Sequence, residues 1–195
     1  MITFIMEAII ETDTSRLISC DHRSQKLIEE CIVEIQDMLL SKPPIVIFGK
    51  QCRQQRDVGF FSNESLGYRY SNQVMEAQPV TPKLQRLLNR ICGLTGMYFN
   101  SILINRYEDG SNYISAHSDD EKGLTHSTVA CVCKGERIFR IRNKLTKEIE
   151  CDIPTLDDKM LIMDGDFQKN YTHEIPVSKI FCQPRYSFTF RCHSE

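Results

Sequence analysis

Hydrophobic residues recur at every third or fourth position in two stretches of the first half of the chain, which is the period of an amphipathic helix. The first stretch covers residues 23–40, and Pro43-Pro44 ends it because the residue before a proline avoids the helical conformation. The second begins at Thr81-Pro82, an N-cap followed by proline at the first helical position. Gly93 is placed to end this helix. The buried stripes are expected to consist of Leu27, Cys31, Ile35 and Leu39 in one helix and Leu84, Leu87, Leu88 and Ile91 in the other.

From Met97 onward, apolar residues alternate with polar ones or form short runs bounded by turn residues, which is the pattern of β-strands. Strands are predicted at 102–107, 129–133, 137–142, 159–163 and 186–191, with Lys134-Gly135-Glu136 as the turn of a hairpin. The apolar runs at 2–10 and 45–48 are interpreted as further strand or core segments, and 49–70 is expected to be irregular. Many short strands separated by turns indicate an antiparallel sandwich or a jelly-roll barrel, with the two helices packed outside.

Length and composition are those of a soluble globular protein. The chain has 195 residues, enough for one domain with a sizeable core, and is 41% hydrophobic and 26% charged. The apolar start lacks a basic leader and is too short to span a bilayer, so we expect no membrane association. Nine cysteines without a Cys-x-x-Cys pair point to a reducing, intracellular compartment. Cys131 and Cys133 are either half of a zinc site or two core-facing thiols, and the second interpretation is favoured.

The net charge of −2 conceals an uneven distribution of charge along the chain. Residues 1–41 carry three Lys/Arg against eight Asp/Glu, whereas residues 42–90 carry eight against three, a net of +5. The segment 49–70 mixes cations with aromatic rings: Lys50, Arg53, Arg56 and Arg69 with Phe60, Phe61, Tyr68 and Tyr70. Aromatic rings stack on exposed bases while cations hold phosphates, so the mixture suits single-stranded nucleic acid. The same residues would also fit an ordinary solvated face, with aromatic rings that only cover a core.

His117-Ser118-Asp119 is a candidate metal-binding pair, because side chains two residues apart on a strand project to the same face. Among the other histidines, His173 precedes the final strands and is the expected third ligand. His22, His126 and His193 are expected to lie outside the site. Two histidines and one carboxylate form the facial triad that suits non-haem Fe(II). Zinc hydrolysis is disfavoured because the chain has no His-Glu-x-x-His.

The strand at the C-terminal end, Arg185-Tyr-Ser-Phe-Thr-Phe-Arg191, supplies a second signal. Its alternation places Arg185, Ser187, Thr189 and Arg191 on one face. Two arginines on the inward face of a strand would bury uncompensated charge unless anions meet them. A dicarboxylate fits, because a planar guanidinium binds a carboxylate through two parallel hydrogen bonds.

Taken together, these motifs resemble the AlkB family of Fe(II)- and 2-oxoglutarate-dependent nucleic-acid dioxygenases. The resemblance runs in order through Asn105-x-Tyr107, His117-x-Asp119, His173 and Arg185-x5-Arg191. It implies an α+β protein: a double-stranded β-helix (jelly-roll) core with flanking N-terminal helices and a substrate-recognition lid. The expected divisions are an acidic N-terminal segment (1–42), a lid and helix (43–96) and the core (97–195), all in one compact unit.

The resemblance also implies a role for each residue. His117, Asp119 and His173 would bind Fe(II), Arg185 would pair with the C5 carboxylate of 2-oxoglutarate, and Arg191 would lie near its C1 end. Asn105 and Tyr107 would hydrogen-bond the same cosubstrate. The expected substrate contacts are Glu121 to the target base, Phe60 or Phe61 as the stacking residue, and Arg53 and Arg56 on the backbone. Tyr68 is a further expected substrate contact.

The implied reaction consumes 2-oxoglutarate and O₂ and releases succinate, CO₂ and, from an N-methylated base, formaldehyde. The expected substrates are bases such as 1-methyladenine and 3-methylcytosine in single-stranded RNA or DNA, and the protein is expected to be a monomer in the cytoplasm or nucleus. Asp166-Phe167-Gln168 also resembles the members found in plant RNA virus replicases, which would imply a viral protein in the host cytoplasm. A protein side-chain hydroxylase of the same fold and a non-catalytic, cupin-like binding module are the competing functions.

Overall fold

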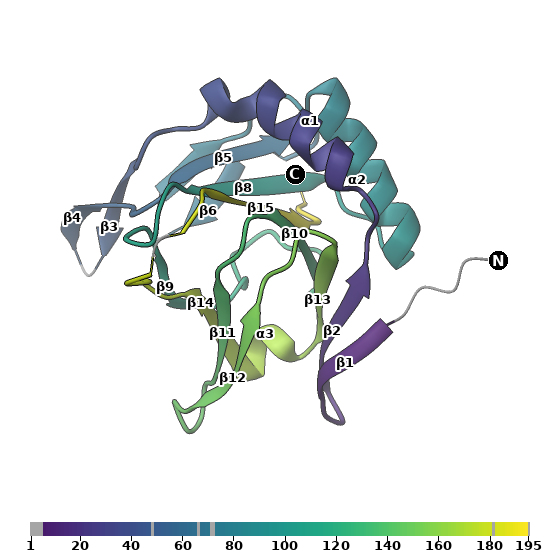
Figure 1. Ribbon diagram of the computed structural model, residues 1–195, viewed down its shortest axis with the longest axis vertical. Coiled ribbons are helices and arrows are strands. Elements are labelled where there is room, and N and C mark those ends of the chain that lie inside the picture. Colours follow the sequence, from purple (N-terminus) through teal and green to yellow (C-terminus); the bar gives the residue numbers. More distant parts are fainter. Residues whose placement is uncertain (1–5, 48, 66, 71–72, 181, 195) are drawn as a thin grey trace.

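Two antiparallel sheets face each other and form the jelly-roll core that the sequence predicts (Figure 1). The computed structural model describes residues 6–47, 49–65, 67–70, 73–180 and 182–194. The larger sheet contains, in spatial order, β1 (Met6–Glu11), β2 (Ser15–Asp21), β13 (Lys159–Gly165), β10 (Val129–Lys134), β15 (Arg185–Arg191), β8 (Ser101–Tyr107) and β5 (Asp57–Ser62). The smaller contains β12 (Ile149–Pro154), β11 (Ile138–Asn143), β14 (Tyr171–Ile175) and β9 (Ile114–His117). Apolar side chains from both sheets form one cluster between them, including Leu17, Tyr107, Phe139 and Ile141.

Both predicted helices pack on the outer face of the larger sheet, as Figure 1 shows. They are α1 (Gln25–Ile35), continued by the short 3₁₀ helix η1 (Gln36–Met38), and α2 (Pro82–Thr95). The Thr81 hydroxyl caps α2 by accepting a hydrogen bond from the Leu84 amide. The helix runs past Gly93 and ends at Thr95, with Gly96 as its C-cap, so the predicted end is wrong. Gly96 has a φ of 68°, and this left-handed conformation is where glycine terminates a helix.

The predicted hairpin across residues 129–142 is a crossing between the two sheets. β10 pairs with β13 and β15, whereas β11 pairs with β12 and β14. The buried Arg137 holds the crossing in place by donating to the carbonyls of Asp109, Asn112 and Pro176 at 2.9, 2.9 and 2.6 Å. These partners come from segments distant in sequence, so the turn residues alone do not reveal which sheet the next strand joins.

The N-terminal segment belongs to the same body as the rest of the chain. β2 pairs along its whole length with β13, and β1 extends the sheet beyond it. Leu17 of β2 is fully buried between the sheets. Residues 1–5 of the predicted N-terminal strand or core segment lie outside the described residues.

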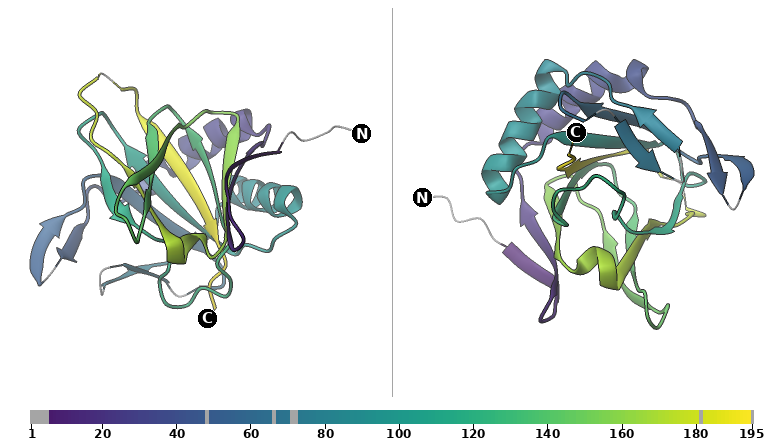
Figure 2. Two further views of the ribbon diagram at one scale, coloured as in Figure 1. Left: turned by 90° about the horizontal axis from the view of Figure 1, so that it is seen from below. Right: turned by 180° about the vertical axis from the view of Figure 1, so that it is seen from behind.

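The segment 43–76 consists of two hairpins on either side of a core strand. β3 (Pro44–Ile47) pairs with β4 (Lys50–Arg53), and β6 (Gly67–Tyr70) pairs with β7 (Gln73–Glu76). The β3–β4 hairpin extends away from the body, as the views of Figures 1 and 2 agree. β5 lies between the hairpins in sequence and pairs with β8. The prediction of an irregular segment at 49–70 is therefore wrong.

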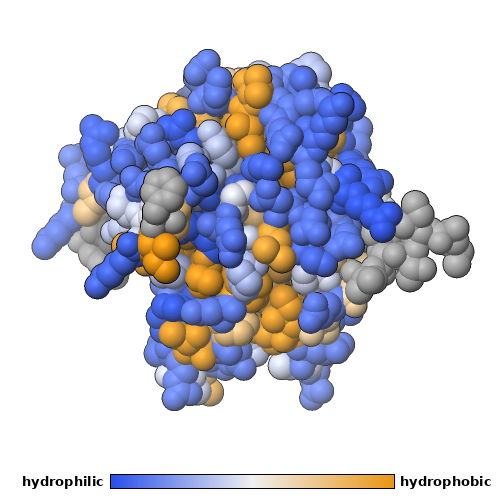
Figure 3. Space-filling view, in the orientation of Figure 1, coloured by the Kyte–Doolittle hydropathy of each residue, from blue (hydrophilic) through white to orange (hydrophobic). Residues whose placement is uncertain are grey.

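The surface differs between the helical side and the opposite end of the molecule. In the orientation of Figure 1, hydrophilic residues cover most of the upper part, and hydrophobic residues gather lower down (Figure 3). Exposed apolar side chains, Ile138, Leu156, Val177 and Ile180, border a groove beside the crossing from β10 to β11. Among the described residues, no helix is long and apolar enough to cross a membrane.

Candidate active site

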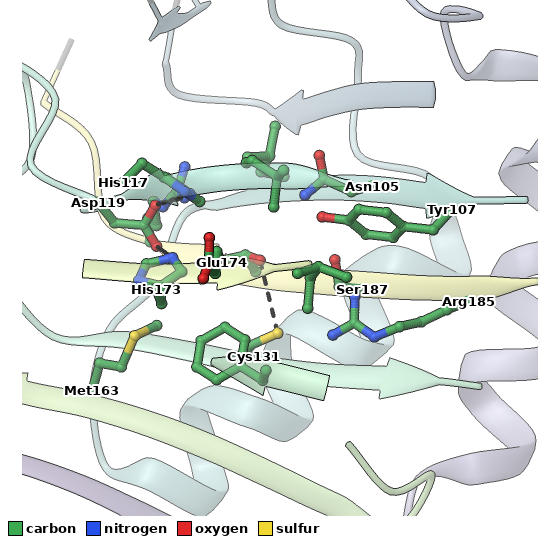
Figure 4. A pocket seen from close by; sticks show the side chains of 16 residues that line it. Asn105, Tyr107, His117, Asp119, Cys131, Met163, His173, Glu174, Arg185 and Ser187 are labelled. Atoms are coloured by element: carbon green, nitrogen blue, oxygen red, sulfur yellow. Dashed lines mark hydrogen bonds and ion pairs between the residues drawn. The ribbon is translucent and has the colours of Figure 1, made fainter. Parts of the chain in front are cut away.

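A polar pocket lies between the two sheets, inside the barrel (Figure 4). The inward faces of β8, β9, β14 and β15 supply most of its lining, which includes Asn105, Tyr107, His117, Asp119, His173, Arg185, Ser187, Thr189 and Arg191. In Figure 4 the histidines and Asp119 lie at one end and Arg185 at the other. The four alternate residues of β15 share this inward face, as predicted, while Phe188 and Phe190 pack against the helices.

His117, Asp119 and His173 meet at one end of the pocket, with one ligand atom from each within 4.8 Å of the others. β9 and β14 are paired so that His117 and His173 are direct cross-strand neighbours, with ring centroids 4.4 Å apart. Asp119 Oδ1 is 3.8 Å from His117 Nε2, and Oδ2 is 3.7 Å from His173 Nε2. The structure therefore brings together the three predicted metal ligands.

Hydrogen bonds to groups outside the metal site orient His117 and position Asp119. His117 Nδ1 lies 2.9 Å from the Ser115 carbonyl oxygen, so Nδ1–H donates there and Nε2 keeps its lone pair for a cation. The Asp119 amide donates to Gln168 Oε1 at 2.9 Å. Gln168 belongs to the short helix α3 (Phe167–Asn170), which precedes β14. The pairing of β9 with β14 thus fixes the histidines, and α3 fixes the loop that carries the carboxylate.

The electrostatics suit a cation. Burial lowers the pKa of both His117 and His173 to about 3, so both imidazoles are neutral near pH 7. Burial raises the pKa of Asp119, although the Arg191 guanidinium opposes the rise. The buried Oδ2 of Asp119 accepts no hydrogen bond from the described residues. Two neutral imidazoles and a carboxylate with an unsatisfied oxygen fit a divalent metal, and the set with open positions is that of non-haem Fe(II).

Arg185 lies at the opposite end of the pocket and is 2% exposed. Its Nε donates to Thr155 Oγ1 at 3.3 Å, and its guanidinium lies 5.4 Å from the centre of the Tyr107 ring. Its Nη1 is buried without a hydrogen-bond partner, and no carboxylate of the described residues pairs with it. An unpaired buried guanidinium is costly, so a carboxylate ligand is the expected partner.

Asn105 and Tyr107 lie on β8, directly opposite Ser187 and Arg185 on β15. The buried Arg56 donates from Nε to Asn105 Oδ1 at 2.7 Å, which turns the amide so that its NH₂ group remains to donate elsewhere. Burial raises the pKa of Tyr107, so its hydroxyl stays protonated. Both side chains are therefore hydrogen-bond donors in the pocket between the metal ligands and Arg185.

Arg191 joins the metal ligands to Glu121. Its Nη2 pairs with Asp119 Oδ1, and its Nη1 lies 3.0 Å from Glu121 Oε1. His193 Nε2 lies 3.3 Å from the same Glu121 oxygen. Burial by itself would raise the pKa of Glu121, but the Arg191 charge and the hydrogen bond from His193 outweigh it and lower this pKa to about 2. Glu121 is therefore an anion held in place from two sides.

Three of the predicted substrate contacts are corrected by the structure. Phe60 and Phe61 are fully buried, Phe60 packed with Val58 and Leu103 and Phe61 in the cluster under the helices. Neither ring can stack on a base, because β5 is a core strand. Arg56 is 4% exposed and serves Asn105, so it does not contact a nucleic-acid backbone. Arg53 is exposed on β4 and stays a prediction. Tyr68 lies in β6, but its side chain is outside the described part of the chain.

Four residues serve the pocket in ways that the sequence did not predict, and one of them, Arg56, was expected to contact the nucleic-acid backbone instead. Arg56 supports Asn105, Gln168 supports Asp119, and Cys131 lines the wall next to Thr189. Burial raises the pKa of Cys131 to about 11, so it remains a thiol. His193, expected to lie outside the site, is buried against Glu121, whereas His126 lies outside as predicted and contacts the Tyr98 carbonyl. A signal existed for Gln168 and Cys131, because the first ends the Asp-Phe-Gln motif and the second begins the Cys-x-Cys pair.

Comparisons with known proteins agree with this geometry. Residues 19–191 match the model of a family described as the 2OG-Fe(II) oxygenase superfamily. A protein of Mus musculus named "DNA oxidative demethylase ALKBH2" is 28% identical over 190 residues, covering 89% of this chain and 80% of that protein. Human "Alpha-ketoglutarate-dependent dioxygenase alkB homolog 3" is 34% identical over 137 residues, 65% of this chain and 48% of that protein. The solved structure "The structure of OsALKBH1" superposes with a TM-score of 0.66 at 10% identity, covering 96% of this chain and all of that one, which shows a shared fold.

Proposed function

Because the chain belongs to the 2OG-Fe(II) oxygenase superfamily, and within it to the AlkB family, we propose that it demethylates N-methylated bases in single-stranded RNA or DNA. The chain is an Fe(II)- and 2-oxoglutarate-dependent dioxygenase for the oxidative demethylation of alkylated nucleic-acid bases. The finer part of the proposal is the substrate: bases such as 1-methyladenine and 3-methylcytosine, reached in an unpaired strand.

One observation carries the proposal: a metal-ligand triad and an unpaired buried guanidinium occupy opposite ends of one pocket. A dicarboxylate cosubstrate needs both features. Its keto acid end binds a metal, and its distal carboxylate needs a cation. A buried arginine whose Nη1 lacks a partner destabilises the fold unless an anionic ligand meets it.

The geometry of the pocket supports the roles that we assign. His117, Asp119 and His173 hold the iron, which, with 2-oxoglutarate and O₂, supplies the oxidising power that converts an N-methyl into a hydroxymethyl group, subsequently lost as formaldehyde. Arg185 binds the C5 carboxylate, and the Tyr107 hydroxyl and the Asn105 amide donate to the same cosubstrate. Arg185 and Tyr107 are buried between the sheets at this end of the pocket.

Arg191 and Glu121 lie on the substrate side of the triad in this assignment. Arg191 holds Asp119 in place and lies near the C1 end of the cosubstrate. Glu121, an anion at neutral pH, is then positioned to accept a hydrogen bond from the amino group of the target base. The basic segment 42–90, with Arg53 exposed on β4, supplies phosphate contacts.

We place the protein in a reducing compartment, the cytoplasm or the nucleus, and expect it to act as a monomer. The support for the compartment is that all nine cysteines are free. The lid that we propose consists of the β3–β4 and β6–β7 hairpins. Elsewhere in the segment 43–96, β5 belongs to the larger sheet and α2 packs on the outer face of that sheet.

Formaldehyde release from methylated oligonucleotides tests the proposal. Single strands containing 1-methyladenine or 3-methylcytosine should yield formaldehyde and succinate in equal amounts, and duplexes should react more slowly because the base must first be unpaired. Asp119→Ala should abolish turnover because it removes the only carboxylate ligand. His126→Ala, a histidine outside the pocket, should keep it. Oxidation of a peptide without formaldehyde release from any methylated strand would instead indicate a protein hydroxylase.

A further inference from the structure

His193 is buried just beyond the last strand, with 4% of its surface exposed. Its backbone is tied to Asn100, whose side chain accepts from the His193 amide and donates to the His193 carbonyl, both at 2.8 Å. Its ring meets Phe60 edge to face, with centroids 5.4 Å apart. Phe60 belongs to a small apolar cluster against which Met75 of β7 packs. The imidazole is therefore held by the Phe60 ring on one side and by the hydrogen bonds of its backbone to Asn100.

Both ring nitrogens of His193 face polar partners. Nδ1 lies 2.7 Å from Ser101 Oγ, and Nε2 lies 3.3 Å from Glu121 Oε1. The Ser101 hydroxyl also lies 3.0 Å from the Arg191 carbonyl oxygen. Since a hydroxyl has one proton, it can donate to Nδ1 or to that carbonyl but not to both.

Either assignment places a proton on Nε2. If Ser101 donates to Nδ1, the neutral ring carries its proton on Nε2, and the Arg191 carbonyl still accepts from the Asn100 amide at 3.0 Å. If Ser101 donates to the carbonyl, Nδ1 must carry a proton. The ring must then be protonated on Nε2 as well, because a lone pair facing the Glu121 carboxylate would be repelled. His193 is thus a donor to Glu121 in both cases.

We propose that His193 is a positioning residue for substrate selection, whose Nε2–H fixes Glu121 in the orientation that meets the methylated base. The proposal deepens the proposed function and rests on it, because it takes Glu121 as the contact to the base. Arg191 contacts the same carboxylate oxygen but also pairs with Asp119. A change at Arg191 would therefore affect the metal ligand as well as the orientation of Glu121. His193 touches neither the metal ligands nor Arg185 through any described hydrogen bond, and its effect is expected on base recognition alone.

Two amide substitutions separate the two nitrogens of the ring. His193→Asn places its amide near the position of Nδ1, so it keeps the contact with Ser101 but does not reach Glu121. His193→Gln places an NH₂ group near the position of Nε2 and keeps the donor to Glu121. Affinity is measured by fluorescence anisotropy without oxygen, in the presence of Mn(II) and 2-oxoglutarate, for a single strand with one 1-methyladenine and for the same strand unmethylated.

For the wild type, the methylated strand should bind more tightly than the unmethylated one. His193→Asn should weaken binding of the methylated strand by about three- to tenfold, with the unmethylated strand and 2-oxoglutarate bound as before. His193→Gln should restore most of the preference at the same melting temperature as His193→Asn.

Unchanged preference in His193→Asn, or equal loss in both variants, would overturn the role of His193. The first result would mean that the hydrogen bond does nothing for the base, and the second that the ring only fills space. If the wild type neither prefers the methylated strand nor releases formaldehyde from it, the proposed function fails, and this proposal fails with it.

Discussion

At the scale of single residues, Arg185 combines complete burial with an unsatisfied donor. It shares the interior of the barrel with Tyr107, and its Nη1 has no hydrogen-bond partner among the described residues. In the AlkB-type assignment, the C5 carboxylate of 2-oxoglutarate completes this site. The guanidinium therefore contributes to affinity through a charge pair in a largely desolvated environment.

Arg185→Ala should weaken 2-oxoglutarate binding by about a hundredfold or more, because breaking a buried charge pair costs about 3–5 kcal/mol. Arg185→Lys should rescue little, since an ammonium cannot form the two parallel hydrogen bonds of the guanidinium. Titration calorimetry of the metal-loaded protein under anaerobic conditions measures the 2-oxoglutarate affinity of both variants. Arg140, paired with Asp152 on the outside of the smaller sheet, is the matched control, and Arg140→Ala should bind normally. Equal affinities in all variants would remove Arg185 from the cosubstrate site.

At the scale of elements, the β3–β4 hairpin presents cations away from the body of the protein. All four residues of β4 are exposed, Lys50 and Arg53 among them. The two-stranded hairpin belongs to neither large sheet. These features suit a contact with the phosphate backbone rather than with a specific base.

Arg53→Ala should weaken binding to every single-stranded sequence alike. It should also reduce the slope of log affinity against log salt concentration by about 0.7, the value for one lost phosphate contact on a single strand. Lys26→Ala removes an exposed cation from α1, on the far side of the larger sheet, and should leave the slope unchanged. Binding isotherms at several salt concentrations measure this slope for the wild type and both variants. A slope equal to that of the wild type would show that the strand does not pass over this hairpin.

At the scale of the whole molecule, the buried histidines make stability depend on pH. In the metal-free protein the pKa of His117 and of His173 is about 3, against about 6.5 when unfolded. Between these pH values the unfolded chain binds more protons than the folded protein. The contribution of the two neutral imidazoles to the free energy of unfolding is therefore complete above about pH 6.5 and is lost as the pH falls toward 3. Burial also lowers the pKa of His22, so His22 contributes to the pH dependence of stability in the same direction.

The free energy of unfolding of the metal-free protein should therefore fall between pH 7 and pH 5, by at most about 1.4 kcal/mol per pH unit for each imidazole. Urea titrations at several pH values measure it. Replacing both His117 and His173 by Gln should make the dependence weaker and leave the contribution of His22, which has the same direction. If that double variant kept the full pH dependence, the metal ligands would not be its source.

The features that could be predicted from the sequence are those set by residues close together along the chain. His117 and Asp119, and Arg185 and Arg191, share a face because alternate residues of one extended segment project the same way. The prediction for Phe60 was wrong because aromatic residues next to cationic ones in sequence occur both in a substrate-recognition lid and in a core strand. Only the pairing of β5 with β8, more than forty residues away, buries it. The sheet crossing after β10 and the contact of His193 with Glu121 were missed for the same reason.

The place of β15 in the larger sheet has a consequence for how the protein folds. This strand, the last along the chain, lies between β10 and β8, in the interior of the sheet. Without it, β1-β2-β13-β10 and β8-β5 have no shared edge. Pairings so distant in sequence form slowly, since a long loop must close before any contact is gained. Arg185 and Arg191 arrive on this strand, so no partly folded state can bind the cosubstrate, and during synthesis activity appears only with completion of the sheet.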